Sequence, residues 1–156
     1  MKEHFYKVCT KWNCNNEDGN KNIRKYDRSH SVSIDNKPTL HLTTDNKAVG
    51  DANKLNPEDL LVSAVSSCHM LSYLYVCALE GVVVLDYIDN AMGTMFENEK
   101  GGGKFKEIVL NPEVIVAHES MIEKAIALHH QAHEICYIAN SVNFDVKCLP
   151  ICSTKI

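Results

Sequence analysis

Two cysteines lie in apolar helical segments, where a thiol could act as a nucleophile or as a redox group. Cys68 is at the centre of the most apolar stretch of the chain, flanked by Ser66, Ser67 and His69. Cys136 lies toward the end of a second helical pattern, on the face expected to turn toward the core. A thiolate attacks electrophiles, but a lone helical cysteine is more often a small core side chain. The residue types alone leave both interpretations open.

The other cysteines do not predict a second site. Cys77 is nine residues from Cys68, which at about 100° per residue places it on the opposite side of the helix. The remaining cysteines are expected to be structural or exposed: Cys9, Cys14, Cys148 and Cys152. The total of seven is odd, and no secretion signal precedes them, so a disulfide framework is not expected.

Histidines accompany the second cysteine. His129 and His133 are four residues apart, and Cys136 follows three residues later. This spacing is compatible with half of a metal site, with His69 or His130 nearby. No second pair of ligands at similar spacing is evident, and side chains that pack and hydrogen-bond around a cysteine pocket would show the same pattern. We therefore expect neither a metal nor a cofactor, and keep a metal-binding protein as an alternative.

A long helix over residues 56–81 must position Cys68. Asn56 is a good N-cap, Pro57 suits the first helical position, and Gly81 is a natural stop. Apolar residues point in every direction between these signals, so we expect a helix that is buried all round. Its length would allow it to span a membrane, but its serines and histidine argue against that.

The rest of the sequence predicts an α+β fold in the order βββ-α-ββ-α-β, forming one domain over residues 1–156. The expected elements are strands at 4–12, 29–34 and 39–43 in an antiparallel meander, a hairpin from 82–96 and 105–117 around a turn at 100–104, a helix at 119–138, a strand at 142–148 and a tail at 149–156.

Composition narrows the function classes. The formal net charge is −4 and no basic block occurs, so nucleic acid is not an expected partner. The first residues carry no apolar core of a secretion signal, so we expect a cytoplasmic protein with no membrane association.

Two motifs resemble those of the OsmC/Ohr family, the osmotically inducible and organic-hydroperoxide-resistance proteins. NPEDLLVSAVSSCHMLSYL is similar to the family's central-helix signature, in which an acidic residue precedes a helical cysteine by ten residues. AHEICYIANSVNFDV resembles the second motif, A-H-x-x-C followed by a terminal strand. The resemblance covers nearly the whole chain and is nearest to the general OsmC-like branch.

This resemblance implies roles for four residues. Cys68 matches the peroxidatic cysteine and Cys136 the resolving cysteine. Glu58 matches an acidic residue that orients an arginine from the N-terminal meander; Arg28 is our choice for that arginine, and Arg24 the alternative. A cationic guanidinium favours the thiolate, and the resemblance implies reduction of an organic hydroperoxide through a Cys68–Cys136 disulfide, with an external dithiol as reductant.

The resemblance also implies an intertwined homodimer. Glu58 and Cys68 are ten residues apart, about 15 Å along one helix, so Glu58 is better placed to hold an arginine against the Cys68 of a second copy. A non-catalytic redox sensor or a protein that binds a small apolar ligand remains the alternative function.

Overall fold

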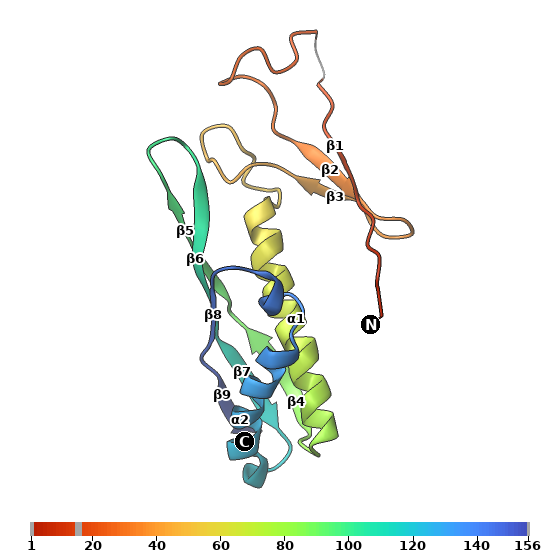
Figure 1. Ribbon diagram of the computed structural model, residues 1–156, viewed down its shortest axis with the longest axis vertical. Coiled ribbons are helices and arrows are strands. Elements are labelled where there is room, and N and C mark those ends of the chain that lie inside the picture. Colours follow the sequence, from red (N-terminus) through yellow and green to blue (C-terminus); the bar gives the residue numbers. More distant parts are fainter. Residues whose placement is uncertain (1, 15–16, 156) are drawn as a thin grey trace. The chain divides into compact units, whose positions relative to one another are not determined.

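The structure is a computed structural model that describes residues 2–14 and 17–155 (Figure 1). It divides into two compact units, Met1–Leu61 and Val62–Ile156, each of which we describe by itself. The elements are β1 (Cys9–Lys11), β2 (His30–Ser33), β3 (Leu40–Leu42), α1 (Pro57–Leu79), β4 (Val84–Asp89), β5 (Met92–Glu97), β6 (Gly103–Leu110), β7 (Pro112–Val116), α2 (Ile122–Ile135), β8 (Asp145–Cys148) and β9 (Ile151–Thr154), with 3-10 turns at Glu119–Met121 and Ala139–Ser141. The chain therefore has the predicted α+β character.

The N-terminal unit contains the predicted antiparallel meander, in the order β1-β2-β3. Asn36 has a φ of 60° in the turn between β2 and β3, where the Lys37 N–H donates to the Ile34 carbonyl over 3.1 Å. The prediction of a half-buried strand over 4–12 was wrong. Only Cys9–Lys11 form a strand, at the edge of the sheet, and the side chains of all three are exposed, so the unit by itself does not cover them.

Helix α1 begins and ends where the local signals predict. The Asn56 side chain accepts a hydrogen bond from the Asp59 N–H over 2.7 Å, and the Asp59 carboxylate accepts one from the Asn56 N–H over 3.3 Å. At the other end Gly81 has a φ of 73°, and the Val82 N–H donates to the Cys77 carbonyl over 2.8 Å. A reciprocal N-cap and a left-handed glycine are local devices, so the sequence alone could locate both ends.

The prediction that α1 is buried on all sides was wrong for the single chain. Its buried residues follow helical spacing on one face: Val65, His69, Tyr73, Val76 and Cys77. Leu71, Tyr75 and Leu79 are exposed on the other side, at 61%, 59% and 65%. The strands and α2 of this unit cover only one face of the helix, so a broad apolar face remains open. By length and hydropathy α1 would also pass as a membrane span, a test that core helices of globular proteins pass equally.

The predicted hairpin is present, but it is divided between two sheets. β5 pairs with β6 and β4 with β7, both antiparallel. The division falls at Asn111, whose N–H donates to the Asp89 carboxylate over 2.7 Å and whose side chain donates to the Asn90 carbonyl over 3.0 Å. The two sheets have the orders β4-β7-β9 and β5-β6-β8.

The C-terminal segment corrects the predicted order of elements. Residues 149–156 were expected to form a tail, but Ile151–Thr154 form β9, which runs parallel to β7. β8 likewise pairs in parallel with β6. The segment CLPICSTKI is short, and its strand pairs with residues nearly forty positions earlier, so local pattern carried no signal for it.

Helix α2 lies beside α1 and β9 (Figure 1) and is shorter than predicted. It ends at Ile135, and Cys136 follows in an extended conformation with φ −74° and ψ 106°. Ile126 of α2 is 41% exposed. The residues that pack against α1 and β7 are Ala125, Leu128 and Ala132. A second core cluster joins Val65 of α1 to Ile108 and Leu110 of β6.

Candidate functional site

The structure brings Cys68 and Cys136 together within the C-terminal unit. Cys68 is half-buried on α1, whereas Cys136, just past α2, is fully buried. Both are free thiols. Burial raises the pKa of Cys136 to about 11; a backbone hydrogen bond from Ala139 lowers it, and hydrogen bonding with the Cys68 thiol raises it. The buried Cys136 is therefore a protonated thiol at neutral pH, in contact with a more accessible partner.

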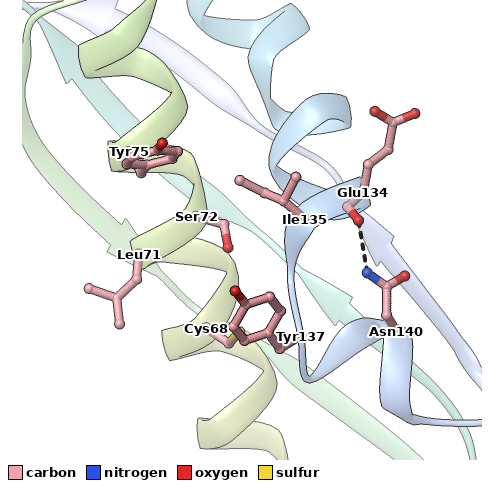
Figure 2. Close-up of a pocket in the computed structure, with 8 residues that line it drawn as sticks. All are labelled: Cys68, Leu71, Ser72, Tyr75, Glu134, Ile135, Tyr137 and Asn140. Carbon is pink, nitrogen blue, oxygen red and sulfur yellow. Dashed lines mark hydrogen bonds between the residues drawn. The ribbon is translucent and has the colours of Figure 1, made fainter. Parts of the chain in front are cut away.

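Cys68 opens onto a cavity of about 690 Å³ with mostly apolar walls (Figure 2). The lining comes from Cys68, Leu71, Ser72 and Tyr75 on α1, and from Glu134, Ile135, Tyr137 and Asn140 at and beyond the end of α2. Figure 2 shows Cys68 and Tyr137 among the residues that line the cavity, and an Asn140 side chain that donates to the Glu134 carbonyl over 2.8 Å. A small apolar molecule in this cavity could reach Cys68 without entering the core.

Arg28 and Glu58, the other predicted site residues, lie in the N-terminal unit and do not pair there. The Arg28 guanidinium donates to the Tyr26 carbonyl over 2.6 Å and to the Ile23 carbonyl, and it stacks 3.6 Å from the centroid of the Tyr26 ring. Arg24, the alternative, is exposed. Glu58 lies in the first turn of α1, and its Oε2 is buried without a hydrogen-bond partner among the described residues.

His129 lies beside different residues from those that the sequence spacing suggests. His129 of α2 lies beside His69 of α1 and Cys148 at the end of β8, rather than forming a group with His133 and Cys136. Burial lowers the pKa of His69 to about 4, and burial lowers that of His129 to about 3. Burial also raises the pKa of Cys148 to about 12. In the metal-free chain the three groups are therefore neutral at pH 7.

Sequence reasoning missed this cluster because its members come from three elements. The alternation of Val142, Phe144, Val146 and Cys148 aligns these residues on one face of a strand, and His129 shares the helical spacing of Cys136. Neither pattern shows which elements meet in the fold, and Cys148 was expected to be structural or exposed. Only the parallel pairing of β8 with β6, which the sequence did not reveal, brings the Cys148 end of β8 to both helices.

An α+β fold with a central helix that carries a cysteine, and a second, buried cysteine against it, defines the class of protein. The model of the OsmC-like protein family matches residues 50–148, and the chain belongs to that family. An OsmC-like protein of unknown function from Vibrio cholerae is 29% identical, with a TM-score of 0.84, over 97% of this chain and 100% of that one.

Two solved structures of organic hydroperoxide resistance proteins share the fold at lower identity. The one from Elizabethkingia anophelis, with thiocyanate bound, is 18% identical with a TM-score of 0.68, over 99% of this chain and 100% of that one. OhrB of Bacillus subtilis is 20% identical with a TM-score of 0.68, over 95% and 98%. A search of curated proteins found no match.

Proposed function

We propose that this protein is a cysteine-based peroxidase that reduces organic hydroperoxides in oxidative stress defence. The observation that carries the proposal is the pairing of two thiols with unequal access. Cys68 lines an apolar cavity, while Cys136 is buried against it. A peroxidatic thiol must meet substrate, and a resolving thiol needs only to meet the oxidised first thiol.

The chemistry runs in three balanced steps. The Cys68 thiolate attacks one oxygen of R–OOH, the O–O bond breaks, and Cys68 becomes a sulfenic acid while the departing alkoxide takes a proton from solvent and leaves as the alcohol. The Cys136 thiol then condenses with that sulfenic acid, forming the disulfide and releasing water. An external dithiol reduces the disulfide, is itself oxidised, and restores both thiols. The apolar walls of the cavity favour an alkyl hydroperoxide over hydrogen peroxide.

The proposal includes Arg28 and Glu58, which need a second copy of the chain to act. Arg28, or Arg24 in its place, would supply the positive charge that favours the Cys68 thiolate and donate hydrogen bonds to the peroxide. Glu58 would hold that guanidinium by a bidentate pair, and its partnerless buried oxygen supports this role. We propose a cytoplasmic homodimer with no metal or cofactor at the cysteine pair.

The test is a count of thiols after one equivalent of tert-butyl hydroperoxide. Wild-type protein should lose two thiols per chain and form a bridge between Cys68 and Cys136 in peptide maps. Cys68→Ser should lose none. Cys136→Ser should lose one, trapped as a sulfenic acid, and then stop turning over. Cys9→Ser, which removes an exposed cysteine of the other unit, should behave as wild type.

The same samples separate the alternatives. A dominant bridge through Cys77, Cys148 or Cys152 would contradict the assigned pair. Thiol loss without catalytic turnover by any dithiol would favour a redox sensor instead, and unchanged thiols with a bound apolar molecule would favour a binding protein.

A further inference from the structure

A buried cluster outside the cysteine pair joins three elements of the C-terminal unit. The His69 Nε2 on α1 lies 3.0 Å from the His129 Nδ1 on α2. The Cys148 Sγ at the end of β8 lies 3.5 Å from the first nitrogen and 3.6 Å from the second. His69 is 0% exposed and His129 4% exposed. Two imidazole nitrogens and one sulfur thus form a compact triangle in which both histidines are buried and the cysteine is half-buried.

The dimensions of this triangle are those of one face of a metal tetrahedron. Bonds of about 2.05 Å to nitrogen and 2.3 Å to sulfur place tetrahedral zinc ligands about 3.3 Å apart for two nitrogens and about 3.6 Å apart for nitrogen and sulfur. Both nitrogen–sulfur edges match, and the nitrogen–nitrogen edge at 3.0 Å is a few tenths of an ångström short.

The surroundings hold the ligands in place. The Tyr73 ring stacks on the His129 ring with centroids 3.8 Å apart, and the Tyr73 hydroxyl donates to the Ala125 carbonyl over 3.1 Å. His69 is in the interior of a long helix, and Cys148 is hydrogen-bonded into the sheet through β8. Ligands fixed by packing lose little freedom when a metal binds.

A cavity beside the cluster leaves room for a fourth metal ligand. A second cavity, of about 400 Å³, is lined by His129, Cys148 and His133 among others. His133 lies one helical turn beyond His129 and is half-buried, so it or a water molecule could complete the coordination.

We propose that His69, His129 and Cys148 bind one zinc ion in this unit of the protein. Two neutral imidazoles with one thiolate are a donor set that zinc favours, and binding would release the Cys148 thiol proton to solvent. The ion would join α1, α2 and β8. The proposal is independent of the peroxidase chemistry, and it replaces the expectation of a metal-free chain.

The test uses the full chain, stripped with a chelator and then titrated with zinc against a chromogenic chelator. Wild type should bind one zinc per chain. Cys148→Ser and His129→Gln should each weaken binding more than tenfold, because each removes a ligand. Matched controls are Cys152→Ser, a half-buried cysteine on β9, and His118→Gln, an exposed histidine before α2 that does not line this cavity; both should bind as wild type.

Cobalt(II) gives a readout that does not depend on activity. Cobalt-loaded wild type and Cys136→Ser should show a thiolate-to-cobalt charge-transfer band in the near ultraviolet, and Cys148→Ser should lack it. If the ligand variants fail to fold, the wild-type protein alone can test the proposal. Bound zinc should protect its Cys148 from alkylation, which peptide maps measure. No stoichiometric zinc, unprotected Cys148, or a blue copper site in preference to zinc would overturn the proposal.

Discussion

At the scale of single residues, the two cysteines of the candidate site carry the same thiol group but differ in how deeply it is buried. Cys136 is fully buried, and burial is the largest cause of its raised pKa. Because the folded pKa exceeds the unfolded value of 9.0, this group contributes stability that is present below pH 9 and lost as the pH rises toward about 11. The raised pKa of Cys136 should also control the rate of the second chemical step, in which Cys136 attacks the Cys68 sulfenic acid.

We expect the rate at which the Cys68 sulfenic acid is resolved to rise with pH. The thiolate fraction of a group with a pKa of about 11 grows about tenfold per pH unit through the neutral range, and the thiolate is the attacking form. Quenched-flow trapping of the sulfenic acid with dimedone between pH 7 and pH 9 measures this. Cys136→Ser should show no such acceleration, and a flat wild-type profile would mean that Cys136 is not the resolving group.

At the scale of elements, α1 is the part of the fold that the sequence located best. Its ends depend on contacts within one turn, so Asn56, Pro57 and Gly81 were sufficient to predict them. Strand β9 and the histidine–cysteine cluster were not predictable in this way, because each depends on pairing between residues far apart in the chain. The Cys68–Cys136 pair was predicted only through the resemblance of two motifs to a known family.

The N-cap of α1 offers a direct test of its contribution. Asn56→Ala removes the side-chain oxygen that accepts from the Asp59 N–H and keeps the backbone N–H that donates to the Asp59 carboxylate, so it should lower the free energy of unfolding by about 1 kcal/mol. Urea titration followed by circular dichroism measures the change. The matched control is Asn143→Ala, an exposed asparagine in a bend, which should change stability little. Equal effects of the two substitutions would show that the cap is not what stabilises the start of the helix.

At the scale of the whole molecule, the open apolar face of α1 supports the predicted homodimer. Leu71, Tyr75 and Leu79 are exposed in the single chain, although their composition is that of a core. A second copy that covers this face would also bring the Glu58 of one helix toward the Cys68 of the other, if the helices cross antiparallel.

Mixing two inactive variants tests this arrangement. Cys68→Ser and Arg28→Ala should each abolish peroxide reduction alone. Refolded together, half of the dimers should be mixed and each should contain one intact site of two, which restores about a quarter of wild-type activity. Refolding each variant with itself is the control. Mixed dimers that remain inactive would reject a site shared between chains, and a monomer at micromolar concentration would reject the dimer.

The burial of α1 against α2 has a consequence for how the chain is made. Tyr73 and Val76 of α1 are covered by Ala125 and Leu128 of α2, about fifty residues later in the sequence. During translation the helix is complete long before its cover exists, so the nascent chain carries an apolar helix that is open on both faces. Until α2 has been synthesised, such an exposed apolar helix is prone to aggregate or to bind chaperones. We therefore expect the nascent chain to be most prone to aggregation in the interval between the synthesis of α1 and that of α2.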